Sequence, residues 1–298
     1  MEKIAVIGAG HVGSHVALEC ARQGLAGEIV LLDADREKAW AQATDVSDAG
    51  APARVCAGGY GDVADADVAV MAACKNGYES SDRLLELPHA LDVAREVADG
   101  LCACGFSGIV VSITNPCDVI AQYLAAKTGL RVIGTGTGFD SVRFRTRIAR
   151  ALGADVRRVG GYCLGEHGDS QVPALSTVTV DEKPLGAAAV EALAPVCRET
   201  VEAGWKVATR KGCTEFGIGA AAARLIRAIL RDEGAEMACS VMLGGEYGGR
   251  GVYAGIPCAV GKGGAKPLPE LALTADERAA LQRSFEVIAR HAELIDRG

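Results

Sequence analysis

The most constraining feature of this sequence is a glycine-rich turn near its start. The apolar strand KIAVIG runs into GAGHVG at 8–13, and a helical pattern follows with Val16 and Cys20 on one face. The next apolar run, EIVLLD, ends at Asp33. Glycines before a helix N-terminus favour a dinucleotide pyrophosphate, and a strand-ending acid can accept hydrogen bonds from ribose hydroxyls. Because Asp33 would repel a 2′-phosphate, the pattern predicts NAD rather than NADP as the cofactor.

The rest of the first half continues the same alternation of strands and helices. Together with the first two strands, the later apolar runs predict six strands joined by crossovers. This pattern indicates an α/β fold, a doubly wound parallel Rossmann sheet, with residues 1–140 as an NAD-binding domain. Ligands of such sheets bind at the carboxyl ends of the strands. The further strands are expected at 53–58, 67–73, 108–114 and 131–136, and the helices at 36–49, 84–100 and 118–128.

The second half changes character and predicts an α+β substrate-binding and catalytic domain over 141–298. A capping box, TADE at 274–277, opens an amphipathic last helix that we interpret as structural. The other expected elements are a strand at 172–180, a long helical region at 187–211, a helix capped by Thr214 that runs to about 231, and an antiparallel pair at 239–245 and 251–261.

Composition excludes several classes of function. The net charge of −7 argues against nonspecific binding of nucleic acid. No apolar run approaches the ~20 residues that span a bilayer, and the chain enters a strand directly, which predicts neither a membrane segment nor a signal peptide. Eleven cysteines, many in apolar surroundings, favour thiols in a reducing cytoplasm. Cys102 and Cys104 lack a second pair at zinc-like spacing, so no metal is expected.

Five polar side chains at strand ends or in loops suggest a catalytic site. Asp140 and Arg143 are three residues apart at the start of a predicted helix, hence on one face. A 2-oxo acid presents a carboxylate that matches a guanidinium fork and a carbonyl that a second cation can polarise, and Arg83 and Arg143 supply two guanidinium groups. A protonated His167 in GEHGDS can deliver the proton, held by a nearby carboxylate. Asn115 is the remaining member of this set.

At this point the chain resembles the L-lactate/malate dehydrogenase family over essentially its whole length. It looks closest to the lactate and L-2-hydroxyisocaproate dehydrogenase branch. The pieces that carry the resemblance are GAGHVG at 8–13, Asp33, DRLLEL at 82–87, ITNPCD at 113–118, GTGTGFDSVRFR at 134–145, GEHGDS at 165–170, KGCTEFGIG at 211–219 and VYAGIPCAVG at 252–261.

The resemblance implies an NAD-dependent L-2-hydroxy acid dehydrogenase and a role for each residue. His167 is the acid/base oriented by Asp140, and Arg143 binds the substrate carboxylate. Arg83 lies on a loop that closes over the substrate, and it stabilises charge on the substrate oxygen. Asn115 holds the substrate oxygen or the nicotinamide side, and its bond to the following proline is a candidate for a cis peptide. The residues implied in NAD binding are Gly8, Gly10, Val12, Gly13, Asp33, Lys38 and Asn115.

Departures from the family pattern concern specificity and regulation. Thr214 is expected to line the substrate pocket beside Gly77, which stands where lactate enzymes carry Gln and malate enzymes Arg. The missing Arg disfavours malate, and the missing Gln predicts tolerance for 2-oxo acids larger than pyruvate. Arg145 matches one contact for fructose 1,6-bisphosphate, but Gly160 replaces a histidine, so weak or absent activation is expected. Cys74 is expected near the cofactor, either as a thiol-sensitive position or as a tolerated small residue.

Alternative functions share parts of this pattern. Malate dehydrogenase is the same chemistry on a different side chain. A non-catalytic NAD(H)-binding redox sensor has no reason to keep His167, Asp140, Arg143 and Arg83 together. An NAD-dependent glycosidase needs a metal-binding Cys/His set that the sequence lacks. The expected partners are a small 2-oxo or 2-hydroxy acid and further copies of the chain, as a homodimer or homotetramer.

Overall fold

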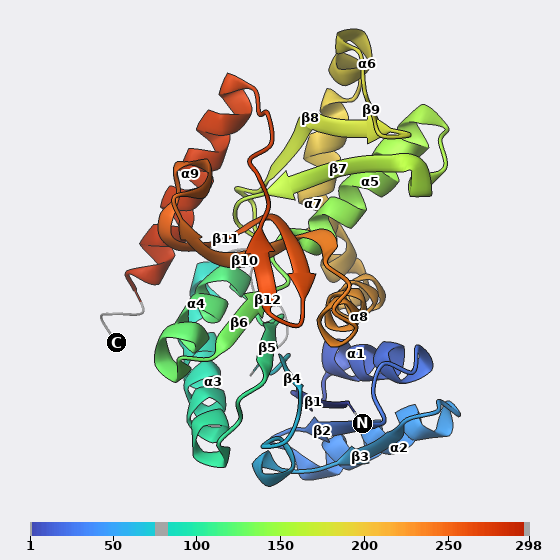
Figure 1. Cartoon of the computed structure of the whole chain (residues 1–298), viewed down its shortest axis with the longest axis vertical. Helices are drawn as coiled ribbons and strands as arrows, with labels where there is room; N and C mark the ends of the chain where they lie inside the picture. The colour runs from blue at the N-terminus through green and yellow to red at the C-terminus, as the bar shows by residue number, and fades with distance from the viewer. Residues whose placement is uncertain (1, 75–82, 295–298) are drawn as a thin grey trace.

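The computed structural model describes residues 2–74 and 83–294, with side chains from residue 87 onward in the second segment. Strands and helices alternate through the first half, as the apolar runs predicted (Figure 1). The elements are β1 (Lys3–Ile7), α1 (His11–Arg22), β2 (Glu28–Leu32), α2 (Arg36–Asp48), β3 (Arg54–Ala57), β4 (Val68–Met71), α3 (Arg83–Cys104), β5 (Ile109–Ser112), α4 (Cys117–Thr128) and β6 (Arg131–Gly134).

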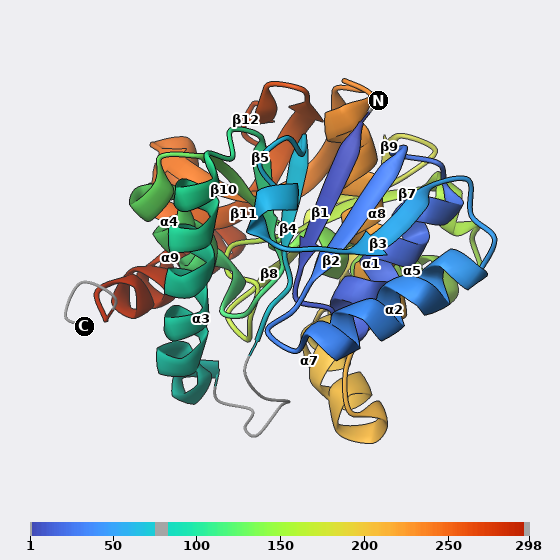
Figure 2. The same cartoon turned by 90° about the horizontal axis from the view of Figure 1, so that it is seen from below.

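The six strands of the first half form a parallel sheet in the order β3-β2-β1-β4-β5-β6. Strand β1 lies in the middle, and its residues Ile4 to Val6 are fully buried, as expected for a strand covered on both faces. Figure 2 shows the fanned strands with α3 and α4 to one side and α1 and α2 to the other. This arrangement is the predicted doubly wound Rossmann sheet.

The second half builds more helices and two further groups of strands. Its elements are α5 (Gly138–Leu152), β7 (Val159–Leu164), β8 (Val172–Val180), β9 (Lys183–Pro184), α6 (Ala187–Ala192), α7 (Ala194–Lys211), α8 (Phe216–Leu230), β10 (Ala235–Gly244), β11 (Arg250–Gly261), β12 (Gly264–Pro267) and α9 (Ala275–Ala292). Strands β7, β8 and β9 form a separate antiparallel sheet.

Strands β10 and β11 confirm the predicted antiparallel pair, but they do not stand apart from the first half. Strand β10 pairs antiparallel with β6 through Ser240 and Gly134, so that β10, β11 and β12 join the six strands of the first half in one nine-stranded sheet. A Cβ at Gly134 would lie 2.7 Å from the Cβ of Ser240, and only glycine permits this approach. The second half is therefore continuous with the Rossmann sheet at its β6 edge.

The structure confirms one expectation about the helices of the second half and corrects another. The region 187–211 is helical, and it forms two helices that meet at Leu193, because Pro195 in the first turn of α7 lacks the N–H that would continue α6. Thr214 does not cap α8, which begins at Phe216 with Glu215 in the N-cap position. The chain at residue 215 has φ of −143° and ψ of −59°, and its carboxylate turns away to ion pairs instead of capping the helix.

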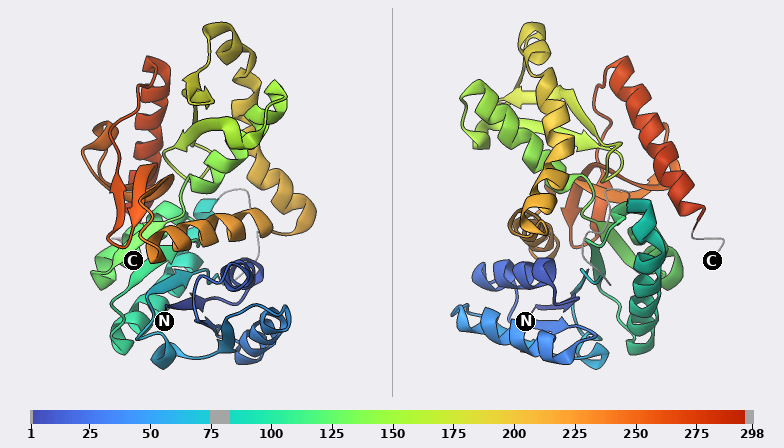
Figure 3. Two further views of the ribbon diagram at one scale, coloured as in Figure 1. Left: turned by 45° about the vertical axis from the view of Figure 1, so that its right-hand side comes forward. Right: turned by 180° about the vertical axis from the view of Figure 1, so that it is seen from behind.

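Helices α8 and α9 brace the two halves of the molecule. Helix α8 lies across α1, where a Cβ at Gly219 would be 3.1 Å from the Cβ of His15 (Figure 3). The predicted capping box of α9 is confirmed, with Thr274 and Glu277 hydrogen-bonded reciprocally. Its apolar face buries Leu281, Phe285 and Ile288, together with the polar Ser284, against the sheet. No helix of the described residues is long and apolar enough to cross a membrane.

Candidate active site

The glycine-rich turn between β1 and α1 forms a narrow cradle. Gly8 has φ of +104°, and a Cβ there would lie 2.5 Å from the backbone of Ala73 in the turn after β4. A Cβ on Gly13 would lie 1.9 Å from the carbonyl oxygen of Gly8. Gly10, the N-cap of α1, faces open space instead, since the atom nearest to a Cβ at this position would be the Lys38 Nζ, 4.0 Å away. The backbone is therefore compact on its inner side and open where a pyrophosphate would approach.

The start of α1 offers the donors that such a phosphate needs. Gly10 makes no side-chain cap for this helix, so the first-turn N–H groups are directed at the open side of the cradle. Half-buried Val12 follows in the first turn. This turn fits the pyrophosphate of NAD, and Gly8, Gly10, Val12 and Gly13 would hold it.

Asp33 lies just beyond the end of β2 and points back to this turn. Its Oδ2 accepts a hydrogen bond of 2.8 Å from the Ala9 N–H and lies 3.4 Å from the Lys38 Nζ, while Oδ1 accepts one from the Asp35 N–H. The carboxylate is thus fixed at the turn, where it fits the adenosine ribose and excludes a 2′-phosphate by its charge. Lys38 lies between this carboxylate and Gly10, which agrees with its predicted place at the cofactor.

Asn115 follows β5 at the same edge of the sheet. Its peptide bond to Pro116 is cis, as the sequence suggested. The neighbouring Thr114 Oγ1 donates to the carbonyl of Ala73 at 2.8 Å, which ties this segment to the turn beside Gly8. The Asn115 Oδ1 is buried and has no hydrogen-bond partner among the described residues. A buried acceptor left unpaired here fits a donor that arrives with the ligand, such as the nicotinamide carboxamide or a substrate hydroxyl.

His167, Asp140 and Arg143 come together through one buried carboxylate. Asp140 lies in the first turn of α5 and Arg143 in the second, while His167 lies in the segment between β7 and β8. The Asp140 Oδ2 is 2.6 Å from His167 Nδ1, and Oδ1 accepts a hydrogen bond of 2.8 Å from Arg143 Nη1. Asp140 is only 1% exposed. Because a carboxylate only accepts, Nδ1 carries the hydrogen in this pair, and Nε2 is the nitrogen that can exchange a proton with a ligand.

The electrostatics of this trio maintain a charged Asp140. Burial on its own would raise the pKa of Asp140, but the imidazole of His167 and the guanidinium of Arg143 hold it well below its ordinary value. The guanidinium also stacks over Phe139, with its carbon 3.9 Å from the ring centroid. Among the described residues, its Nη2 and Nε make no hydrogen bond, which leaves this side of the fork for a carboxylate.

Asp118 is a site residue that the sequence reasoning missed. It is 2% exposed, and its Oδ2 accepts a hydrogen bond of 2.7 Å from the His167 backbone N–H. Burial raises the pKa of Asp118 to about 6, against the lowering effect of that bond and of the nearby Ser240 hydroxyl. Ser284 of α9 holds the other side of the loop, since its Oγ accepts from the Glu166 N–H at 2.8 Å. The only signal in the sequence was an acid at the end of ITNPCD.

The remaining predicted residues are placed less fully. Arg83 begins α3, but its side chain and all of Gly77 lie outside the described residues. Thr214 lies in the segment between α7 and α8, half-buried, with Glu215 beside it 3.3 Å from His11 of the glycine-rich turn. Cys74 is exposed and directly follows Ala73, which packs on Gly8. The segments that carry Thr214 and Cys74 therefore border the cofactor turn.

A Rossmann sheet with a dinucleotide cradle, and with a histidine paired to a buried carboxylate beside its strand ends, defines a nicotinamide-dependent dehydrogenase. Comparison with known proteins makes the assignment more specific. Residues 2–133 match the family model described as lactate/malate dehydrogenase, NAD binding domain. Residues 137–295 match the lactate/malate dehydrogenase alpha/beta C-terminal domain. The chain belongs to the lactate/malate dehydrogenase family.

Individual relatives agree with this family assignment. The chain is 37% identical to L-lactate dehydrogenase 1 of Bifidobacterium longum, over 98% of this chain and 97% of that protein. A ligand-bound minor L-lactate dehydrogenase from Enterococcus mundtii superposes with a TM-score of 0.93 and 33% identity, covering 98% of each chain. The lactate dehydrogenase of Cryptosporidium parvum, solved with lactic acid and nicotinamide adenine dinucleotide, superposes with a TM-score of 0.94 and 30% identity. The match covers all of this chain and 98% of that one.

These comparisons confirm the main expectations from the sequence. The predicted family, the Rossmann fold class and NAD as the cofactor are borne out, as is an NAD-dependent dehydrogenase activity of the 2-hydroxy acid type.

Proposed function

We propose that this enzyme reduces pyruvate or a larger 2-oxo acid, such as 2-oxoisocaproate, to the L-2-hydroxy acid, and catalyses the reverse oxidation. The observation that carries the proposal is the pair of His167 Nδ1 and Asp140 Oδ2 at 2.6 Å, with Arg143 on the second oxygen of the same carboxylate. The proposed proton donor, His167, and the proposed carboxylate-binding fork, Arg143, thus share one carboxylate. Relatives named L-lactate dehydrogenase support the choice of substrate class.

In the proposed reaction, each side chain acts on a different part of the oxo acid. Arg143 binds the substrate carboxylate through the nitrogens that Asp140 does not use. NADH supplies the hydride that reduces the carbonyl carbon. His167 gives its Nε2 proton to the carbonyl oxygen, and the buried charge of Asp140 stabilises the imidazolium and fixes the ring. Arg83 polarises the carbonyl, and Asn115 orients the substrate oxygen or the nicotinamide.

Specificity is proposed to depend on a pocket bounded by Thr214 and Gly77. With glycine at the discriminating position there is no guanidinium to pair with a second carboxylate, so oxaloacetate lacks a partner. The same glycine leaves room for a branched or longer side chain. We therefore expect kcat/KM for 2-oxoisocaproate to equal or exceed that for pyruvate, and both to exceed that for oxaloacetate.

Purified enzyme assayed for NADH oxidation with these three oxo acids tests the proposal. A clear preference for oxaloacetate would identify a malate dehydrogenase and refute the assignment. Tight binding of NADH without turnover of any oxo acid would identify a sensor of the NAD(H) pool.

The role of Arg143 has its own test with a matched control. Arg143→Lys keeps the charge but loses the fork, and the loss of a charge-assisted hydrogen bond of ~1.5–3 kcal/mol predicts a rise in KM for pyruvate of about 10- to 100-fold. Arg150→Lys, at an exposed position on the same helix, is expected to leave KM unchanged. Equal KM values for both variants would exclude Arg143 as the carboxylate ligand.

We also propose the organisation in which the enzyme works. Residues 1–140 act as the NAD-binding domain and 141–298 as the substrate domain, in a cytoplasmic homodimer or homotetramer. The exposed apolar side chains Trp205 and Phe216, 42% and 65% exposed, support assembly. Buried cysteines such as Cys20, Cys163, Cys239 and Cys258 occur as thiols, which suits a reducing compartment. Light scattering of the purified enzyme gives the subunit number, and a monomer would contradict this assembly.

A further inference from the structure

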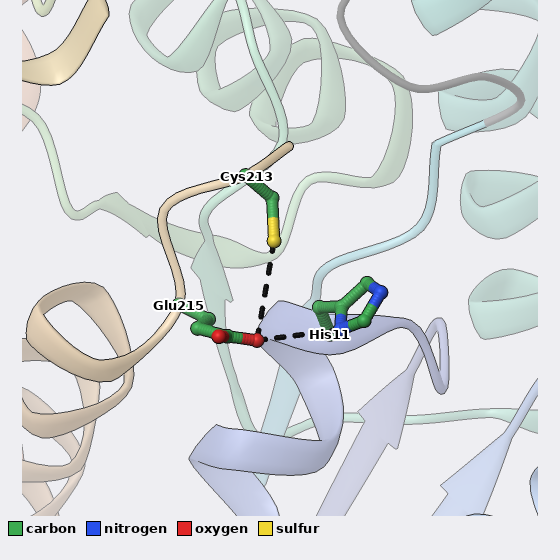
Figure 4. Close-up of side chains that lie close together, drawn as sticks. All are labelled: His11, Cys213 and Glu215. Atoms are coloured by element: carbon green, nitrogen blue, oxygen red, sulfur yellow. Dashed lines mark hydrogen bonds and ion pairs between the residues drawn. The ribbon is translucent and has the colours of Figure 1, made fainter. Parts of the chain in front are cut away.

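A second group of reactive side chains lies at the start of α1, outside the His167 site. His11 opens α1, and Cys213 and Glu215 lie in the segment between α7 and α8 (Figure 4). The Glu215 Oε2 lies 3.3 Å from His11 Nδ1 and 3.9 Å from Cys213 Sγ. One nitrogen, one sulfur and one oxygen thus surround a common point, and all three atoms lie within 4.8 Å of one another.

These three atoms are the donor types that zinc prefers. Zn²⁺ binds Cys sulfur at ~2.3 Å and His nitrogen or carboxylate oxygen at ~2.0–2.2 Å, usually in tetrahedral geometry. Ligand atoms of such a site are then roughly 3.3–3.8 Å apart, so the present spacing needs a contraction of about 1 Å. The His11 side chain is 77% exposed and can make that movement by rotation. Within residues 2–74 and 83–294, no other group of three such side chains brings its ligand atoms this close.

The surroundings of the cluster leave its ligand atoms accessible to a cation. Lys211 is ion-paired with the Glu215 Oε1 and stacks on Phe216, so it occupies the carboxylate oxygen that faces away from the other two ligands. Oε2 remains directed at His11 and Cys213. The Nδ1 of His15 also lies 3.7 Å from Oε2, but that nitrogen donates to the carbonyl of His11 at the shorter distance of 2.8 Å. A water molecule is therefore expected as the fourth ligand.

We propose that His11, Cys213 and Glu215 form a three-ligand site for Zn²⁺, or for a cation of similar ligand preference, with water in the fourth position. On binding, the Cys213 thiol loses its proton to solvent, and the Cys213 thiolate and Glu215 carboxylate balance the two charges of the metal. The site joins the glycine-rich turn of the first half to the segment that carries Thr214 in the second. It therefore clamps the two halves of the enzyme at the border of the cofactor cradle.

This proposal goes beyond the dehydrogenase assignment and does not depend on it. The competing explanation is that Glu215 simply forms a surface ion-pair network with Lys211 and a protonated His11. Such a network, in which the Glu215 side chain is 11% exposed, has no need of a sulfur ligand. The two explanations differ in one observable, which is whether the Cys213 sulfur binds a metal.

Cobalt titration of the chelator-treated, full-length enzyme without NADH tests the proposal. We expect one Co²⁺ per chain with thiolate-to-cobalt charge-transfer absorption, and displacement of this cobalt by Zn²⁺. Cys213→Ser is expected to abolish the absorption. Cys102→Ser, which removes an exposed cysteine on α3, should keep it. Glu215→Gln is expected to weaken Co²⁺ binding by at least about tenfold, since even the loss of a ligand's hydrogen-bonded partner typically costs about 10- to 100-fold.

The outcomes that overturn the proposal are equally distinct. No stoichiometric uptake by the wild type, or charge-transfer absorption that persists in Cys213→Ser, would place no metal at this cluster. Circular dichroism verifies that each variant is folded. His11→Asn, at an exposed position, serves as a second test should Cys213→Ser fail to fold. Unchanged cobalt affinity in His11→Asn would also refute the site.

Discussion

Asp140 is the carboxylate on which both His167 and Arg143 depend, and Asp140→Asn tests this directly. The substitution keeps the size of the side chain and removes its charge. The 2.6 Å contact with His167 Nδ1 is lost, and the 2.8 Å hydrogen bond from Arg143 Nη1 is kept only with a neutral acceptor. The first loss is worth ~1.5–3 kcal/mol and the second, from a charge-assisted to a neutral hydrogen bond, about 1 kcal/mol, so together they sum to about 2.5–4 kcal/mol. At 1.36 kcal/mol per tenfold, kcat/KM for pyruvate is expected to fall by about 100- to 1,000-fold.

The orientation of the imidazole explains why the loss falls on catalysis. An asparagine that accepts from Arg143 through its oxygen presents its amide hydrogens to His167 Nδ1, which stabilises the tautomer with the hydrogen on Nε2 and no longer supports the imidazolium. Initial rates of NADH oxidation measure the effect, and fluorescence titration with NADH verifies that the variant is folded.

The matched control is Asp169→Asn, which removes an exposed charge two residues from His167 and should leave kcat/KM unchanged. A kcat/KM for Asp140→Asn within tenfold of the wild type, with normal NADH binding, would refute the reasoning.

Three further predictions concern stability, cofactor binding and regulation. Burial raises the pKa of Asp118 from 3.8 to about 6, so the native state binds this proton more tightly and stability falls as pH rises across that interval. At pH 7 the free energy of unfolding of Asp118→Asn should therefore exceed that of the wild type by up to ~3 kcal/mol. At pH 4 the two proteins should be equally stable, and an equal gain in stability at both pH values would contradict this. In Gly8→Ala, the new Cβ would lie 2.5 Å from the backbone of Ala73. The substitution should destabilise the fold by ~1–3 kcal/mol and weaken NADH binding by at least about tenfold in a fluorescence titration. Normal NADH affinity would count against the glycine-rich turn as the pyrophosphate site. Fructose 1,6-bisphosphate should stimulate activity little or not at all, since Gly160 cannot supply a cationic contact, and strong activation in the same assay would exclude this.

The first half of the fold could be predicted because its information is local. Each parallel strand is a short apolar run that is buried on both faces. The turn before the first helix is marked by glycines close together in the sequence, at positions 8, 10 and 13. The His167, Asp140 and Arg143 constellation was predicted for a different reason. Residue chemistry and spacing suggested the types of group that the site needs, and the resemblance to a known family assigned their roles and joined two distant segments.

The missed features all depend on contacts between distant segments. The continuation of the sheet from β6 to β10 rests on a close approach of Gly134 and Ser240, which no periodicity reveals. Asp118 supports a backbone amide 49 residues away, so its residue type gave no indication of its partner. The sequence also showed no sign of the cluster of His11, Cys213 and Glu215, because His11 lies 202 positions before Cys213 in the chain. The prediction that Thr214 caps α8 followed a local preference for threonine at helix N-caps and was wrong. Glu215 takes the N-cap position instead, and ion pairs with distant residues hold its side chain.

The account depends most on proton transfer by His167, and a single-turnover measurement tests it most directly. Enzyme loaded with NADH is mixed with pyruvate in a stopped-flow instrument, and the rate of NADH oxidation is compared between the wild type and His167→Asn. The loss of a positioned acid predicts a rate lower by about 100- to 10,000-fold in the variant. A rate within tenfold of the wild type would show that another group supplies the proton, and would contradict the mechanism.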